Sequence, residues 1–309
     1  MLSRIAESLF WIGRYIERVD GTSRLVDVVR LAMLEDSLGA YAEESAHTVL
    51  SVVMGSDPGD RVVAYSDLRD SLVFDRTNPS SVTGSWTAAR ENARRARETV
   101  STDLWQGINT AWLGWGRLGP PDGTARHLAW ARERAILIAG VADSTMSHDD
   151  AWDFLVLGRY LERADMTARI ITTGALSTGA LSWQSVLSSC GGQQSYMRSS
   201  SGLALDRGIA EFLVLNRLFP RSVMYALTHA EATLQRLDPD RQPIGFATEG
   251  LRLLGRVRTS LEYRHPAEIL ADLPQVMAWV QSMLTEVSDA VAQRYFPGDM
   301  EESWTEEAR

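Results

Sequence analysis

Residues 13–24 read Gly-Arg-Tyr-Ile-Glu-Arg-Val-Asp-Gly-Thr-Ser-Arg, and residues 158–169 read Gly-Arg-Tyr-Leu-Glu-Arg-Ala-Asp-Met-Thr-Ala-Arg. Eight of the twelve positions are identical without a gap. Unrelated segments match at about one position in twenty, so this similarity indicates an internal repeat. A degraded third copy is suggested at 212–221, which keeps Arg217 and Arg221 but has Pro220 where the glutamate would stand.

Each copy of the repeat predicts a helix that is apolar on both sides. In the first copy Ile12, Ile16 and Val19 form an apolar stripe opposite the charges. Phe10 and Val29 project on the charged side, before and after the charges. A helix of this kind is normally buried, so we expect the two repeat helices to meet and to enclose their charged residues.

Enclosed charges must be paired, because an unpaired buried ion costs several kcal/mol. We therefore expect Glu17 and Glu162 each to bond an arginine, with Arg163 and Arg18 as partners across the pair. The glycine that opens each copy would let the two backbones approach closely. A structural ion-pair network is the preferred interpretation, and a network that also lines a ligand site stays open as an alternative. The predicted central charge cluster consists of Arg14, Glu17, Arg18, Asp20, Arg24, Arg159, Glu162, Arg163, Asp165 and Arg169.

The composition limits the possible partners and cell compartment. The 309-residue chain has a net charge of −9, and all 31 of its basic residues are arginine. This acidity argues against nucleic acid or an anionic membrane as the main partner. The only cysteine, Cys190, excludes an intrachain disulfide and is typical of a reducing compartment. Without a long apolar stretch or a secretion signal, the expected location is the cytoplasm.

Helical periodicity dominates the chain, and alternating strand patterns are absent. We expect an all-α, multi-helix bundle with two pseudo-symmetric repeats and the motif helices packed at its centre. It would form a single domain over 1–309, with halves of about 1–145 and 146–296 and a flexible acidic tail at 297–309. Residues 190–201, rich in Gly, Ser and Gln, are expected to form an exposed loop. The predicted helices are 2–34, 40–54, 60–73, 84–100, 102–113, 122–144, 148–174, 203–218, 221–237, 244–264 and 267–296.

A second group of charged residues lies on the helix expected at 84–100. It is a possible anion or partner contact, since arginines on one helix face can bind carboxylate or phosphate groups. A helix surface with local ion pairs is the alternative. The residues of this group are Arg90, Glu91, Asn92, Arg94 and Arg97.

Two Glu-x-x-His pairs, Glu44/His47 and Glu262/His265, have the spacing used in di-iron helical bundles. The second pair directly precedes Pro266, where a helix should end, so its side chains would be poorly held. We expect no metal site and no cofactor.

Three segments resemble the Alpha-E family, a bacterial helical family named for its Glu-Arg motif. Residues 1–18 read Met-Leu-Ser-Arg-Ile-Ala-Glu-Ser-Leu-Phe-Trp-Ile-Gly-Arg-Tyr-Ile-Glu-Arg, and residues 154–165 read Phe-Leu-Val-Leu-Gly-Arg-Tyr-Leu-Glu-Arg-Ala-Asp. Residues 89–98, Ala-Arg-Glu-Asn-Ala-Arg-Arg-Ala-Arg-Glu, look like that family's other recurrent block. The resemblance covers essentially the whole chain.

The resemblance also implies a functional setting. Family members typically occur beside, or fused to, ATP-grasp ligase-like proteins and transglutaminase-like proteins, which implies peptide synthesis or modification. The function expected from it is a non-catalytic helical partner subunit of such a system. The alternative is an enzyme or small-ligand-binding protein that uses the central Glu/Arg cluster on a peptide or amino-acid carboxylate. A homo-oligomeric scaffold is a third possibility.

Overall fold

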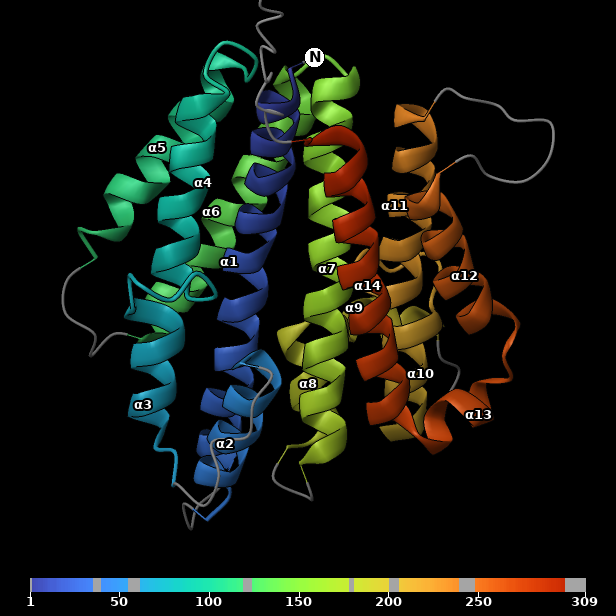
Figure 1. The fold of residues 1–309 in the computed structure, drawn as a ribbon. Helices are drawn as coiled ribbons and strands as arrows, with labels where there is room; N and C mark the ends of the chain where they lie inside the picture. The colour runs from blue at the N-terminus through green and yellow to red at the C-terminus, as the bar shows by residue number, and fades with distance from the viewer. Residues whose placement is uncertain are drawn as a thin grey trace, which may run out of the picture.

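The computed structural model describes residues 2–35, 40–54, 62–118, 124–177, 181–199, 206–238 and 248–297. Every regular element in these ranges is a helix, so the all-α prediction is confirmed (Figure 1). The predicted acidic tail lies outside the described residues from 298 onward. Within the described part, no helix is both long and apolar enough to cross a membrane.

The helices differ widely in length, and the two longest carry the repeat. In chain order they are α1 (Ser3–Glu35), α2 (Ala40–Met54), α3 (Tyr65–Arg69), a π-helical turn η1 (Asp70–Phe74), α4 (Val82–Arg95), α5 (Thr102–Trp115), α6 (Thr124–Thr145), α7 (Asp150–Leu176), α8 (Trp183–Ser189), α9 (Gln193–Ser199), α10 (Asp206–Leu215), α11 (Val223–Leu237), α12 (Glu249–Tyr263), α13 (Pro266–Ala271) and α14 (Leu273–Tyr295).

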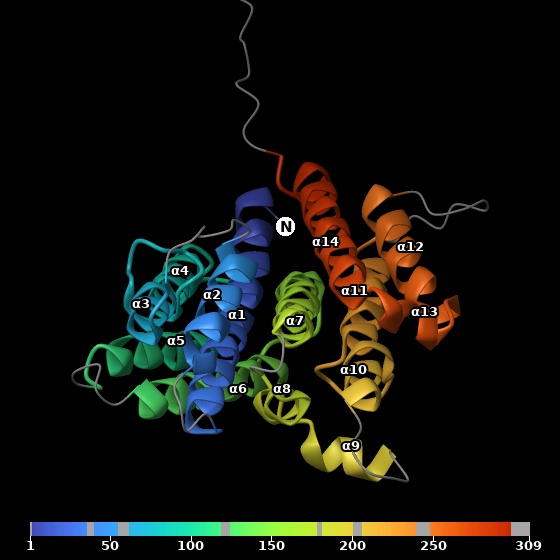
Figure 2. The ribbon, with the colours of Figure 1, turned by 90° about the horizontal axis from the view of Figure 1, so that it is seen from below.

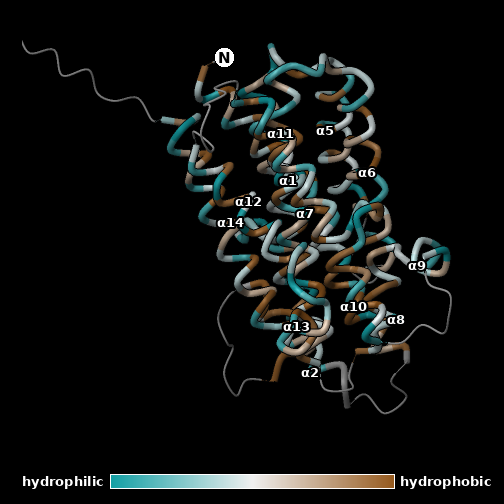
Figure 3. The backbone as a smooth tube through the Cα atoms, turned by 90° about the vertical axis from the view of Figure 1, so that its right-hand side faces the viewer, coloured by the Kyte–Doolittle hydropathy of each residue, from teal (hydrophilic) through white to brown (hydrophobic). Residues whose placement is uncertain are grey.

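The motif helices α1 and α7 lie side by side in the middle of the bundle (Figures 1 and 2). Helices α4 and α6 pack on α1, while α11 and α14 pack on α7. Both motif helices are covered from several directions, which is why each needs apolar residues on both sides. Leu9 and Val19 on one side of α1 and Leu25 and Val29 on the other are completely buried. Figure 3 shows hydrophobic and hydrophilic positions along the same helices.

The neighbours of the two motif helices correspond in chain order. Helix α5 contacts α4 and α6, and α12 likewise contacts α11 and α14. Helix α2 contacts α7, and α8 contacts α1. Two pseudo-symmetric halves would give this arrangement, although the boundary between them near residue 145 stays a prediction.

The turns before α4 and α11 have the same hydrogen bonds. Ser81 and Ser222 cap these helices, each accepting the N–H of the residue three positions later. Each hydroxyl also donates to a carbonyl six residues earlier, that of Asp75 or Asn216. The prediction of a third copy of the motif at 212–221 is therefore wrong, because 216–222 forms the turn that corresponds to 75–81.

The expectation of an exposed loop at 190–201 is wrong in its secondary structure, because Gln193–Ser199 forms α9, although most of the described residues of this segment are exposed. Cys190 caps the end of α8 and is buried, which raises the pKa of its thiol to about 11. Gly191 then turns the chain with a φ of +66°, a conformation open to glycine. Tyr196 on α9 is buried against Phe212, with ring centroids 5.4 Å apart. Two aromatic rings provide the apolar burial that the composition of this segment did not indicate.

The helix predicted at 267–296 is divided into α13 and α14 at Asp272, whose φ of −139° and ψ of 58° are not helical. Pro274 occupies the first turn of α14, where its missing N–H costs nothing. The proline therefore lies in the first turn of a new helix, because inside a continuous helix it would lack the N–H that bonds the carbonyl four residues earlier.

Candidate functional site

The two motif helices cross at the glycines that open the two copies of the repeat. A Cβ atom on Gly13 would lie 1.9 Å from the carbonyl oxygen of Leu155. On Gly158 it would lie 2.1 Å from the carbonyl oxygen of Phe10. Each backbone therefore occupies the space where the other helix lacks a side chain. This reciprocal approach agrees with the close contact expected from the sequence.

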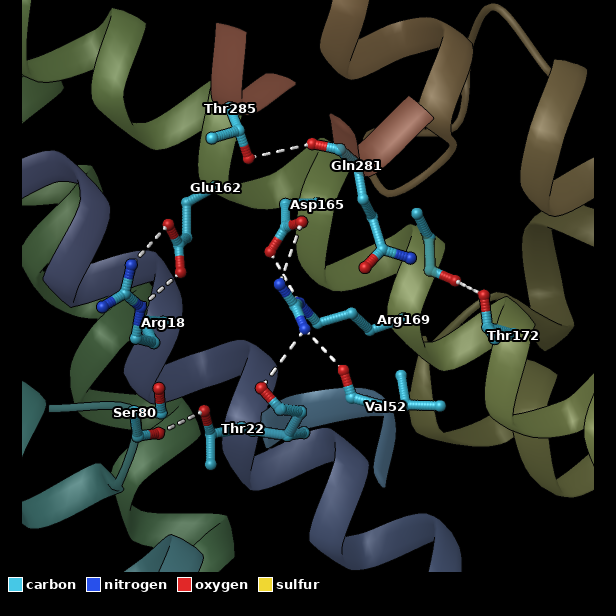
Figure 4. Close-up of polar contacts among 12 residues, drawn as sticks. Arg18, Thr22, Val52, Ser80, Glu162, Asp165, Arg169, Thr172, Gln281 and Thr285 are labelled. Carbon is cyan, nitrogen blue, oxygen red and sulfur yellow. Dashed lines mark hydrogen bonds and ion pairs between the residues drawn. The ribbon is translucent and has the colours of Figure 1, made fainter. Parts of the chain in front are cut away.

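Glu162 receives two arginines from α1. The Arg18 guanidinium donates through Nε at 2.5 Å and through Nη2 at 3.0 Å, one bond to each carboxylate oxygen (Figure 4). Arg14 Nε lies 2.8 Å from the same carboxylate, and its Nη1 donates to Ser288 on α14 at 3.1 Å. The predicted pairing of Arg18 with Glu162 is thus present as a bidentate ion pair, the strongest geometry for these groups.

Glu17 makes the reciprocal pair with α7. Arg163 donates to its two oxygens at 2.8 and 2.7 Å. A further guanidinium comes from Arg221, in the turn before α11, at 3.2 Å from Glu17 and 2.6 Å from Asp20. The sequence singled out Arg221 only as part of the supposed third copy. Its loop corresponds to the turn at 75–81, which has Ser80 at this position, so the repeat gave no reason to place it at the centre.

Arg159 does not join the two glutamates. Its Nη1 donates to both carboxylate oxygens of Asp143 on α6, at 3.0 Å each. The equivalent residue on α1, Arg14, reaches Glu162 instead. The prediction is therefore confirmed for the residues that bond Glu17 and Glu162, but it wrongly included Arg159 in their cluster.

Each motif helix also has an aspartate four residues before an arginine. Arg24 Nε donates to Asp20 at 2.8 Å, and Arg169 Nε donates to Asp165 at 2.7 Å. The other nitrogens of these guanidiniums reach the carboxyl-terminal turns of neighbouring helices. Arg24 donates to the final carbonyl of α8, and Arg169 donates to the carbonyl of Val52 in α2 at 2.6 Å (Figure 4). Since the last carbonyls of a helix have no partner within it, these arginines attach α8 and α2 to the centre.

The arginines keep the buried carboxylates ionised. Burial is the largest single effect and would raise the pKa of Glu17, but the charge and hydrogen bonds of Arg163 together with the charge of Arg221 outweigh it, so the pKa lies below its ordinary value of 4.5. For Glu162, Arg18 and Arg14 together likewise outweigh burial and lower the pKa. For Asp20, the neighbouring arginines overcome burial and lower the pKa to about 2. Carboxylates in this state accept hydrogen bonds and are poor general acids near neutral pH.

These shifts predict acid sensitivity. A carboxylate whose pKa is lower in the folded state stabilises the fold above its unfolded pKa, here 4.5 for glutamate and 3.8 for aspartate. That stabilisation is lost as the pH falls through the folded pKa, about 2 for Asp20. We expect the thermal unfolding midpoint to be level above about pH 5 and to fall steadily below it. Calorimetry over this range measures it, and equal midpoints at pH 3 and pH 7 would contradict the ionised network.

The network is enclosed. The side chains of Glu17 and Glu162 are only 6% and 1% exposed, and their arginine partners across the helix pair are each less than 17% exposed. Five cavities in the described part of the chain, with volumes of about 320–750 Å³, have linings that include neither glutamate. The burial of both carboxylates suits a structural ion-pair network.

The second predicted group, on α4, divides between two surfaces. Arg90 points toward α5, donating to Asn109 at 2.8 Å with its guanidinium 4.4 Å from the Trp112 ring centre. Arg94 instead bonds Glu91 on its own helix at 2.7 Å, and both side chains are exposed. The group is therefore not one continuous basic strip.

Asn92, Arg94 and Arg97 line a surface groove between the end of α4 and the first turns of α1, with a volume of about 750 Å³. Its wall on α1 includes Trp11 and Tyr15, whose rings stack with centroids 5.4 Å apart. This groove, which we call the α1/α4 groove, is lined by Leu2, Arg4, Ile5, Glu7, Ser8, Trp11, Tyr15, Asn92, Arg94, Arg95, Ala96, Arg97, Glu98 and Thr99.

The second Glu-x-x-His pair has other roles in the structure. Glu262 bonds Arg217 at 2.6 Å and also pairs with Arg258. His265 is the residue before α13 and accepts the N–H of Ala267 at 3.2 Å. Among the described residues, no group of three or more His, Cys, Asp or Glu side chains has the arrangement of a metal site.

The chain also matches a known protein family. The model of the Alpha-E family, described as a predicted alpha-helical domain with a conserved ER motif, matches residues 1–296. The chain belongs to the Alpha-E family. Its Glu-Arg dipeptides at 17–18 and 162–163 are the residues that form the reciprocal ion pairs described above.

Sequences similar to this chain occur in mycobacteria. Proteins of Mycobacterium bovis and Mycobacterium tuberculosis, named only as uncharacterized, are 24% identical to this chain over 346 aligned residues. The alignment covers 99% of this chain and 38% of each relative. The chain thus spans well under half the length of these relatives. No solved structure matches it significantly.

Proposed function

We propose that the chain is a non-catalytic helical partner subunit of a cytoplasmic peptide synthesis or modification system. Its partners would be an ATP-grasp ligase-like protein and a transglutaminase-like protein, the neighbours that the family resemblance implies. The observation that carries the proposal is the closure of the Glu–Arg network. The charged residues around Glu17 and Glu162 are bonded to one another and withdrawn from solvent.

The chemistry of the network supports a structural role. Glu17 and Glu162 each accept two or more arginine contacts, which occupy the lone pairs that a catalytic base would need. Their lowered pKa values also remove them from proton transfer near neutral pH. Breaking the network to admit a substrate would expose unpaired buried charges, at a cost of several kcal/mol.

The mycobacterial relatives give independent support. In them, sequence similar to this chain makes up 38% of a longer protein. We propose that this helical domain contacts further sequence of that kind, whether or not the two belong to one polypeptide.

Co-purification tests this function. The tagged chain is co-expressed with an ATP-grasp ligase-like protein from the same genome, and then with a transglutaminase-like protein, each followed by size-exclusion chromatography with light scattering. We expect a stable complex with at least one of them. A matched control uses the tag fused to an unrelated helical protein of similar net charge.

Two results would overturn the proposal. One is the absence of a complex with either protein at concentrations of about 10 μM, where functional complexes are normally populated. The other is turnover of a peptide or amino-acid substrate by the purified chain alone, which would favour an enzyme that uses the central Glu/Arg cluster. Light scattering of the chain by itself also reports whether it forms homo-oligomers.

A further inference from the structure

The α1/α4 groove has an equivalent position in the second half of the chain. The motif repeat relates each residue of α1 to the residue 145 positions later on α7, so Ser8 corresponds to Asp153 and Tyr15 to Tyr160. The matching serine caps relate α4 to α11 with an offset of 141, so Arg95 corresponds to Arg236. The two surfaces can therefore be compared residue by residue.

In the second half these positions are bonded directly to one another. Arg236 donates to Asp153 through Nε at 2.9 Å and through Nη2 at 2.5 Å. The same Nη2 donates to Thr233, which corresponds to Asn92 of the first half. Asp153 is only 7% exposed at its side chain. An internal carboxylate thus bridges α7 and α11.

In the first half that carboxylate is missing. Ser8 stands at the position of Asp153, and its hydroxyl donates to the carbonyl of Arg4. Among the described residues, the ion-pair partner of Arg95 is Glu91, four residues earlier on its own helix, at 3.3 Å. Both side chains of this pair are well exposed, at 64% and 39%. Exposed pairs of this kind hold their partners weakly, so Arg95 can exchange Glu91 for another carboxylate at little cost.

The remaining lining favours an acidic ligand with an apolar part. Four arginines line the groove against two glutamates, in a chain whose overall charge is −9. The stacked rings of Trp11 and Tyr15 form an apolar wall beside them. A volume of about 750 Å³ accommodates several amino-acid side chains. The charged lining residues are Arg4, Arg94, Arg95, Arg97, Glu7 and Glu98.

We propose that the α1/α4 groove binds an acidic peptide segment of a partner protein. A carboxylate of that segment takes, at Arg95, the place that Asp153 occupies beside Arg236, and a neighbouring apolar side chain packs on Trp11. This inference rests on the proposed partner function and specifies the docking surface. The asymmetry between the halves carries it, since Arg236 has an internal carboxylate partner on the motif helix and Arg95 has a serine at the corresponding position.

A fluorescein-labelled peptide, Gly-Glu-Leu-Glu-Leu-Glu-Gly, serves as the probe, and fluorescence anisotropy measures its binding to the full chain. Arg95→Glu is expected to weaken binding about tenfold or more, because it replaces attraction by repulsion. Ser8→Asp is expected to do the same by supplying the internal carboxylate of the second half. Arg256→Glu, an equal charge change at an exposed position on α12, should leave the affinity unchanged. The peptide with Gln in place of every Glu should bind far more weakly.

Equal affinities of the wild type and Arg95→Glu for the probe would overturn the inference, as would equal losses in Arg95→Glu and Arg256→Glu. Arg95 is exposed, so its variant tests the groove even if Ser8→Asp folds poorly. The same variants are then tested in the co-purification experiment. If the wild type and Arg95→Glu form the complex equally well, the groove is not the docking surface, and the proposed partner function is unaffected. Failure of the wild type to form any complex would instead refute the partner function.

Discussion

Replacing Gly158 by alanine is expected to destabilise the protein by on the order of 3 kcal/mol, although alanine is the better helix former by about 1 kcal/mol. The new Cβ atom would lie 2.1 Å from the carbonyl oxygen of Phe10, which belongs to the backbone of α1. A backbone atom in a buried helix cannot rotate away as a side chain can, so the two motif helices must separate. Gly13→Ala should behave in the same way, with its Cβ 1.9 Å from the carbonyl oxygen of Leu155.

Gly140→Ala is the matched control. Gly140 lies within α6, and a Cβ atom there would meet nothing within 4 Å. This variant should gain up to about 1 kcal/mol from helix propensity. Chemical denaturation of the three variants measures the difference. A Gly158→Ala protein as stable as Gly140→Ala would show that the helices do not meet at this glycine.

Removing a carboxylate from the network is expected to cost about 3–5 kcal/mol, because it leaves buried arginine without a partner. Glu17→Ala would release Arg163 and also the contact from Arg221. Arg163→Ala would leave Glu17 with Arg221 as its remaining arginine. Replacing Glu17 and Arg163 together should cost less than the sum of the two single changes, since neither charge is then left without its partner.

Urea unfolding of the two single variants, the double variant and the wild type gives this coupling energy. Arg94→Ala is the control, since it removes an arginine from an exposed ion pair with Glu91 and should leave the unfolding midpoint unchanged. Additive effects of the Glu17 and Arg163 changes would mean that the two residues are not energetic partners. Normally stable variants that lose partner binding would assign the network a functional role.

Much of the centre of this fold could be predicted from the sequence. Helical periodicity depends on residues three and four positions apart, so the apolar stripes on both sides of 2–34 and 148–174 already indicated two buried helices. Because enclosed charges must be paired, two buried helices also predict that Glu17 and Glu162 bond arginines across the helix pair. The repeated glycine gave the place of closest approach, because only a position without a side chain lets two helix backbones meet. Each of these inferences uses local spacing or duplication, which the sequence contains in full.

Only the tertiary structure decided which distant groups join that centre. Arg221 enters from a turn, Arg159 turns away to Asp143, and Cys190 is buried at the end of a short helix. Ser8 and Arg95 both line the α1/α4 groove, whereas an aspartate bonds an arginine at the corresponding positions of α7 and α11. These contacts depend on how helices far apart in the chain are positioned against one another. The partner of each arginine therefore depends on that packing, because a guanidinium bonds whichever carboxylate or carbonyl the assembled helices bring within about 3 Å.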